Sequence, residues 1–272
     1  MDVLTRNAVV VSGTPGAPPL LLAHGFGCDK SMWRLVAPAF EATHRVVTFD
    51  HVGAGASDLT AWDPARYGSL QGYADDVVQI VEALDLGPVV LVGHSVSAII
   101  GLLAAADRPE IFDRLVLVGP SPRYVDDDGY RGGFSAAEIE ELLETMDDNY
   151  LGWSRHIAPV IMGNADRPEL GAELTNAFCR TDPAIARHFA RTTFLSDNRA
   201  DLARVRTPAL VLQSREDVIA PPEVGRWVHE HLAGSELVVL DAVGHCPNLS
   251  APGEVVAAMT RYLERTPEAA QR

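Results

Sequence analysis

The sequence contains little cysteine and little basic charge, and it has no long apolar run. Three cysteines among 272 residues are too few for a disulfide scaffold, so we expect a reducing compartment. Only 22 Lys and Arg oppose 37 Asp and Glu, and the net charge of −15 disfavours nucleic acid and anionic membranes as partners. No apolar run approaches the roughly 20 residues that span a bilayer. The first residues lack the pattern of a secretory signal, so we expect a cytoplasmic protein.

The pattern of hydrophobic residues predicts an α/β fold. Short β-branched runs alternate with amphipathic stretches, which is typical of a mostly parallel sheet flanked by helices. The expected strands cover residues 8–11, 19–23, 44–50, 88–92, 113–118, 208–213 and 236–240. Residues 72–86 have apolar side chains at helical spacing and should form a helix that packs on the core.

A long segment without strand signals interrupts this alternation. Ser135 and Glu138 have the spacing of a capping box, so a helix should begin there, and further helical stretches follow. We predict that residues 121–196 form a helical lid, and that residues 1–120 and 197–272 form the core domain. The aromatic residues gathered in this segment suggest an apolar cavity between lid and sheet.

Ser95 lies where a strand should turn sharply into a helix. The segment Gly93-His94-Ser95-Val96-Ser97 follows an apolar run and precedes a helix-like one, as expected for the nucleophile elbow of a hydrolase. An ordinary turn carrying an exposed serine is the alternative on these five residues alone. The last glycine of the usual motif is replaced by Ser97, which is small enough to keep helix and strand close.

A serine hydroxyl needs a base and a group that orients the base. Asp217 and His245 each follow a predicted strand, and the order Ser95, Asp217, His245 is that of α/β-hydrolases. We therefore predict Asp217 as the orienting acid and His245 as the general base. The alternatives are Glu216 and Asp241 for the acid, and His24, His51 and His94 for the base.

The glycine-flanked turn at Phe26 can complete such a site. The backbone N–H groups of Phe26 and Val96 are our candidates for an oxyanion hole. Neither the acidic triplet at residues 126–128 nor the histidines at 229 and 231 has the spacing of a metal site. The predicted chemistry needs no cofactor and no metal.

With these motifs the chain resembles the small-ligand α/β-hydrolases that include the bacterial stress regulator RsbQ and the plant karrikin and strigolactone receptors. The resemblance covers nearly the whole chain and is carried by HGFGCDKSMW (24–33), YADD (73–76), GHSVSA (93–98), SPRY (121–124), GGF (132–134) and GHCP (244–247). It implies the same triad and four lid helices around a hydrophobic pocket. The side chains that it implies for the pocket are Phe26, Phe134, Trp153, Phe189 and Phe194.

The same resemblance implies that hydrolysis is coupled to signalling through a protein that docks on the lid, in the RsbQ case a phosphatase with a PAS sensor domain. His156 and Ile157 depart from an aromatic position of the plant receptors, which argues against their specific ligands. The leading hypothesis is thus a slow serine hydrolase for a small apolar ester, lactone or enol ether. The second is a ligand-sensing regulator, and the third a cofactor-free peroxidase or C–C bond hydrolase.

Overall fold

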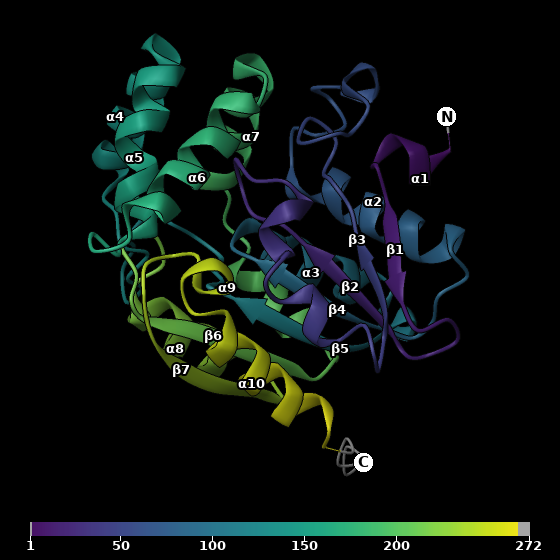
Figure 1. Ribbon diagram of the computed structural model, residues 1–272. Helices are drawn as coiled ribbons and strands as arrows, with labels where there is room; N and C mark the ends of the chain where they lie inside the picture. Colours follow the sequence, from purple (N-terminus) through teal and green to yellow (C-terminus); the bar gives the residue numbers. More distant parts are fainter. Residues whose placement is uncertain (1, 266–272) are drawn as a thin grey trace.

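A seven-stranded sheet forms the centre of the molecule, for which a computed structural model describes residues 2–265 (Figure 1). The strands are β1 (Val10–Gly13), β2 (Pro19–Ala23), β3 (Arg45–Thr48), β4 (Val89–His94), β5 (Phe112–Val118), β6 (Ala209–Glu216) and β7 (Ser235–Val243). Their order in the sheet is β1-β3-β2-β4-β5-β6-β7, and only β1 runs antiparallel to its neighbour. Each predicted strand is present within a few residues. The last residues of the predicted core range, 266–272, lie outside the described part.

Helices cover both faces of the sheet because its strands carry apolar side chains on both sides. On β2, Leu20 and Leu22 belong to one hydrophobic cluster, while Leu21 and Ala23 belong to the other. Helices α2 (Leu70–Ala83), α3 (Val96–Asp107) and α8 (Pro222–His231) contribute to the second cluster, and α10 (Pro252–Leu263) contributes to the first. The short helices are α1 (Val3–Arg6) and α9 (Pro247–Ser250), with 3-10 turns at Lys30–Trp33, Ala37–Ala39, Leu59–Ala61, Pro109–Ile111 and Arg199–Arg204.

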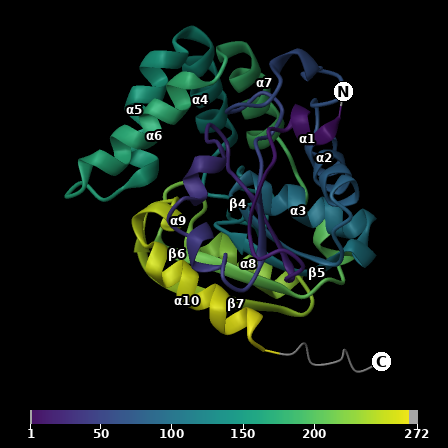
Figure 2. The ribbon, with the colours of Figure 1, turned by 45° about the vertical axis from the view of Figure 1, so that its right-hand side comes forward.

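Four helices are inserted between β5 and β6 and stand together at one end of the sheet (Figure 2). They are α4 (Ala136–Asp148), α5 (Tyr150–Met162), α6 (Pro168–Arg180) and α7 (Pro183–Phe194). The predicted capping box opens α4, since Glu138 N–H donates to Ser135 Oγ at 3.2 Å and Ser135 N–H donates to Glu138 Oε2 at 2.7 Å. The buried side chains of Ile139, Leu143 and Met146 form one stripe along this helix, which continues to Asp148.

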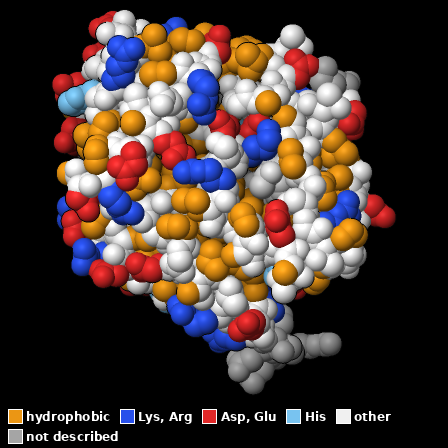
Figure 3. Space-filling model, viewed as in Figure 1, with side chains coloured by type: hydrophobic (Ala, Val, Ile, Leu, Met, Phe, Trp, Pro, Cys, Tyr) orange, Lys and Arg blue, Asp and Glu red, His pale blue; other side chains and the backbone are white. Residues whose placement is uncertain are grey.

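The surface mixes charged and apolar side chains. On the face shown in Figure 3, acidic, basic and hydrophobic groups are interspersed. Within residues 2–265, every helix is too short or too polar to span a bilayer.

Candidate active site

Ser95 occupies a strained turn between β4 and α3. Its backbone has φ 56° and ψ −123°, a conformation that L-residues rarely adopt outside functional turns. The Ser95 N–H donates to the Val118 carbonyl at 2.8 Å, which ties the turn to the next strand. A side chain at Gly93 would place its Cβ 2.3 Å from the Ser97 carbonyl oxygen, so only glycine fits where the helix folds back on the strand.

Three buried side chains form a hydrogen-bonded chain at this turn. Ser95 Oγ lies 2.7 Å from His245 Nε2, and His245 Nδ1 lies 2.7 Å from Asp217 Oδ2. The structure thus brings together the three residues predicted from their order in the sequence. The alternative acids lie at the surface, where Glu216 and Asp241 both pair with Arg215.

Asp217 is oriented by the backbone that follows it. Its Oδ1 accepts the N–H groups of Ile219 at 2.8 Å and Ala220 at 3.0 Å, so Oδ2 is left for the histidine. A carboxylate on Nδ1 holds the proton there and leaves the Nε2 lone pair facing the serine hydroxyl. This arrangement allows His245 to remove the hydroxyl proton from Ser95.

His94 supports the base rather than replacing it. Its Nε2 donates to the His245 carbonyl oxygen at 2.8 Å, and the His245 N–H donates to the Ile161 carbonyl at 2.9 Å. Burial lowers the pKa of His94 to about 3, with the nearby His245 as a second cause, so the ring is neutral at ordinary pH. His94 is therefore a neutral donor that fixes the backbone of the base.

Two backbone N–H groups next to Ser95 can receive a developing negative charge. Within residues 2–265, neither Phe26 N–H nor Val96 N–H has an acceptor, and Val96 is the first residue of α3, where the helix dipole is positive. The Phe26 loop approaches the elbow closely, since a Cβ on Gly25 would lie 3.2 Å from Ser95 Cβ and 2.5 Å from His94 Nδ1. Free donors beside a nucleophile are the elements of an oxyanion hole.

Ser97 lies outside the chain of Ser95, His245 and Asp217. Its hydroxyl is within 2.5 Å of the His24 carbonyl oxygen and 2.7 Å of His51 Nε2. Ser97 therefore faces the loop that carries Phe26, and only Ser95 faces the base. The rings of His24 and His51, two of the alternative bases, have other partners. His51 Nε2 contacts Ser97, and His24 Nδ1 lies 2.9 Å from the Gly25 carbonyl oxygen.

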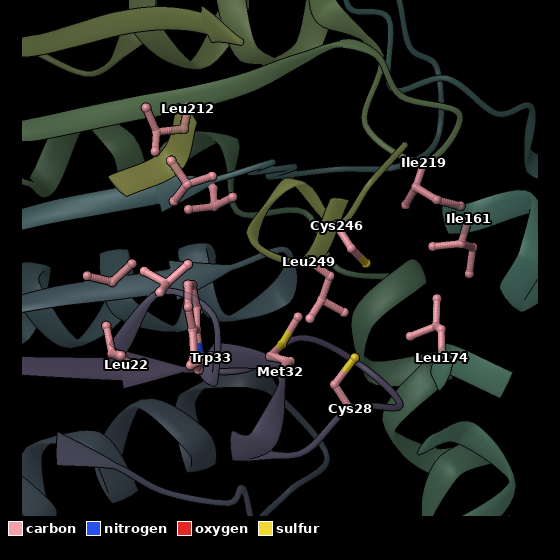
Figure 4. Close-up of a cluster of buried hydrophobic side chains, with 14 of the residues drawn as sticks. Leu22, Cys28, Met32, Trp33, Ile161, Leu174, Leu212, Ile219, Cys246 and Leu249 are labelled. Atoms are coloured by element: carbon pink, nitrogen blue, oxygen red, sulfur yellow. The ribbon is translucent and has the colours of Figure 1, made fainter. Parts of the chain in front are cut away.

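A mostly apolar cavity opens beside Ser95 between the sheet and the inserted helices. The empty space among its lining atoms, part of it open to solvent, amounts to about 400 Å³. Its polar side chains are those of Ser95, His94, His245, Tyr124 and Thr193. The remaining lining residues are Phe26, Cys28, Ile161, Leu174, Phe178, Phe194, Ile219 and Cys246. Figure 4 labels five of these residues: Ile161 on α5, Leu174 on α6, and Cys28, Ile219 and Cys246 on the core.

Three of the five aromatic side chains expected to line the pocket do not border this cavity. Phe26 and Phe194 do, whereas Phe134, Trp153 and Phe189 do not. Trp153 stacks on Phe178 with ring centroids 5.8 Å apart, and Phe178 is the ring that borders the cavity. Phe189 packs between Phe26 and Tyr73, at 5.7 Å and 4.5 Å. Phe134 is partly buried against the core.

The residues that sequence reasoning missed adjoin motifs that it used. Tyr124 ends the SPRY segment, Cys28 follows the Phe26 loop, and Cys246 follows the base. Burial raises the pKa of Cys28 to about 12 and that of Cys246 well above its ordinary value, so both thiols stay protonated. They are walls of the cavity and not nucleophiles.

The groups considered for metal binding have other partners in the structure. Among residues 2–265, no cluster of three His, Cys, Asp or Glu side chains could hold an ion. Asp127 pairs with Arg199 at 2.8 Å, and His229 Nδ1 lies 2.9 Å from Ser235 Oγ. These polar groups have structural partners.

The chain is similar to known proteins along most of its length. A profile described as the alpha/beta hydrolase family matches residues 20–258. The chain is 41% identical to strigolactone esterase D14 of Arabidopsis thaliana over 97% of its length and 98% of the relative. It is 37% identical to karrikin insensitive 2 receptor CA of Petunia hybrida over 91% of this chain and 92% of that one. A hydrolase from Oleispira antarctica superposes with a TM-score of 0.95 at 41% identity, covering 97% of both chains.

Proposed function

This chain belongs to the alpha/beta hydrolase family, and on that premise we propose that it is a serine hydrolase for a small, largely apolar ester, lactone or enol ether. The observation that carries the proposal is the buried chain from Ser95 Oγ through His245 to Asp217, with both contacts at 2.7 Å. Relatives named as an esterase and as receptors, 41% and 37% identical, support this substrate class.

In the proposed reaction Ser95 Oγ attacks the acyl carbon while His245 Nε2 takes its proton. Asp217 stabilises the imidazolium through the hydrogen bond at Nδ1. The N–H groups of Phe26 and Val96 stabilise the negative charge on the acyl oxygen. His245 then protonates the leaving oxygen, a water attacks the acyl-Ser95 ester, and the same residues repeat their parts.

The cavity sets the class of substrate. Among the described residues that line it, none is Asp, Glu, Lys or Arg, and burial holds the pKa of His94 low enough to keep that ring neutral. A charged substrate would therefore lose its hydration without a partner, whereas an apolar ester would not. The helices of residues 121–196 act as the lid of this cavity, over the described part of the core, residues 2–120 and 197–265.

Hydrolysis of p-nitrophenyl esters of increasing acyl length, compared between the wild type and Ser95→Ala, tests the proposal. We expect turnover of short acyl chains that Ser95→Ala abolishes, together with an initial burst of nitrophenol as the acyl-enzyme forms. Ser154→Ala is a matched control because this buried hydroxyl donates to the Tyr150 carbonyl within α5. Equal turnover by wild type and Ser95→Ala would contradict the proposal.

A second candidate function is ligand sensing, favoured by the relatives named as karrikin insensitive 2 receptors. In that case the output is a complex with a protein partner on the lid, as the resemblance to RsbQ implies. Ser95→Ala should then still be stabilised by a butenolide lactone in a thermal shift assay, without turning it over. A variant that binds no lactone would argue against sensing as a separate output.

A further inference from the structure

We propose that Ser97 and His51 are positioning residues for the oxyanion hole: they hold the His24–Gly25 backbone so that the Phe26 N–H faces the acyl oxygen. The inference rests on the proposed function, because the Phe26 N–H has this task only if an acyl group is attacked. It assigns a use to the serine that replaces the last glycine of the elbow motif.

The hydrogen bonds of this network have one consistent direction. The His24 carbonyl oxygen can only accept, so Ser97 Oγ donates to it at 2.5 Å. Ser97 Oγ must then accept from His51, which places the proton of His51 on Nε2 at 2.7 Å. The His51 N–H in turn donates to His24 Nε2 at 3.1 Å, so the proton of His24 is on Nδ1 and is donated to the Gly25 carbonyl at 2.9 Å.

The last of these contacts aims the Phe26 N–H. The Gly25 carbonyl and the Phe26 N–H belong to one peptide unit, and in a planar trans peptide they point in opposite directions. The Gly25 carbonyl is held by His24 Nδ1 and by the Cys28 N–H at 3.3 Å. The Phe26 N–H is therefore turned to the other side of the unit and kept free for a ligand. Ser97 fixes the preceding peptide unit through the His24 carbonyl.

Burial makes this network rigid. His24 and Ser97 are 0% exposed and His51 is 1% exposed, so bulk water does not compete for these hydrogen bonds. Burial also lowers the pKa of both histidines, which keeps the rings neutral and each proton on the nitrogen that its partner requires. Removing the Ser97 hydroxyl leaves the His24 carbonyl and His51 Nε2–H without partners at once, and the loop can then rotate.

The test compares Ser97→Ala, His51→Phe and His51→Gln with wild type, using p-nitrophenyl acetate as substrate and an alkyl trifluoromethyl ketone as a tetrahedral-intermediate analogue. We expect Ser97→Ala and His51→Phe to lower kcat about 10-fold, a part of the 100- to 1,000-fold loss known for a missing oxyanion donor. KM should change less than about twofold, and the ketone should bind weaker by the same factor as kcat/KM falls. His51→Gln keeps an N–H that can reach Ser97, so its kcat should stay within about threefold of wild type.

Ser154→Ala is the matched control, since it also deletes a buried hydroxyl that donates to a backbone carbonyl at 2.7 Å, but within α5. Equal kcat and equal ketone affinity in Ser97→Ala and wild type would overturn the inference alone. An equal loss of kcat in Ser154→Ala would also overturn the inference, because deleting any buried hydroxyl would then lower the activity. If Ser97→Ala does not fold, the contrast between His51→Phe and His51→Gln decides. A wild type without Ser95-dependent turnover would overturn the proposed function, and this inference with it.

Discussion

Replacing Asp217 with asparagine should switch the proton of His245 to the wrong nitrogen. In the wild type, Asp217 Oδ1 accepts the N–H groups of Ile219 and Ala220, and Oδ2 accepts His245 Nδ1–H. Asparagine has one carbonyl oxygen, and this oxygen must accept the N–H groups of Ile219 and Ala220. The side-chain amide would then face His245 and donate to Nδ1, which moves the ring proton to Nε2. Nε2 could no longer accept the proton of Ser95.

The size of the effect follows from the two backbone donors. Turning the amide around would leave both buried N–H groups without an acceptor, at about 1–3 kcal/mol each, so the active form is disfavoured by about 2–6 kcal/mol. At the upper end this matches the roughly 10⁴-fold loss of kcat that such a tautomer change produces. Steady-state hydrolysis of p-nitrophenyl acetate measures the loss, and ¹⁵N NMR of the histidine rings reports which nitrogen of His245 carries the proton.

Asp241→Asn is the control, because this carboxylate is 77% exposed and pairs with the exposed Arg215. Its turnover should equal that of wild type. Two results would refute the reasoning: Asp217→Asn with more than about a tenth of wild-type kcat, or an NMR spectrum in which Nδ1 of His245 keeps its proton.

Three further predictions concern the surroundings of the site. Gly25→Ala should lower kcat about 100-fold with little change in KM, because the new Cβ, 3.2 Å from Ser95 Cβ, displaces the loop that carries one oxyanion donor; an unchanged kcat would contradict this. His94 binds its proton at a pKa of about 3 when folded and near 6.5 when unfolded, so the unfolding free energy should fall as pH falls through that window, by up to about 1.4 kcal/mol per unit. Urea titrations at several pH values give the slope of the unfolding free energy against pH, and in His94→Gln this slope should be smaller by the equivalent of about one proton. An identical slope would refute the low pKa of His94. The raised pKa values of Cys28 and Cys246 predict that iodoacetamide near pH 8 spares both in the folded protein and labels both in urea; mass spectrometry detecting either adduct in the folded protein would speak against it.

The fold and the three hydrogen-bonded side chains of Ser95, Asp217 and His245 could be predicted from local patterns in the sequence. Buried parallel strands such as β4 read as continuous apolar runs, so their positions are visible in the sequence. Ser95 and Asp217 follow the buried strands β4 and β6, and His245 follows the edge strand β7. The carboxyl ends of these parallel strands meet at one edge of the sheet.

The pocket walls and the task of Ser97 depend on contacts between distant segments. Trp153 and Phe178 are equally suitable rings on α5 and α6, and only the packing of these helices decides that Phe178 borders the cavity. Ser97 meets His51 and His24 from 46 and 73 positions away. A contact over such a distance leaves no local pattern in the sequence, so the sequence predicts for Ser97 only that it is small enough to fit the turn.

The most direct test of the account is labelling with a fluorophosphonate probe followed by peptide mapping. The peptide that contains the turn at residues 93–97 carries the adduct, and its position within that peptide distinguishes Ser95 from Ser97. We predict that the adduct is on Ser95, that Ser95→Ala prevents labelling, and that Ser97→Ala still reacts, only more slowly. An adduct on Ser97, or labelling that persists in Ser95→Ala, would contradict the assignment of Ser95 as the nucleophile.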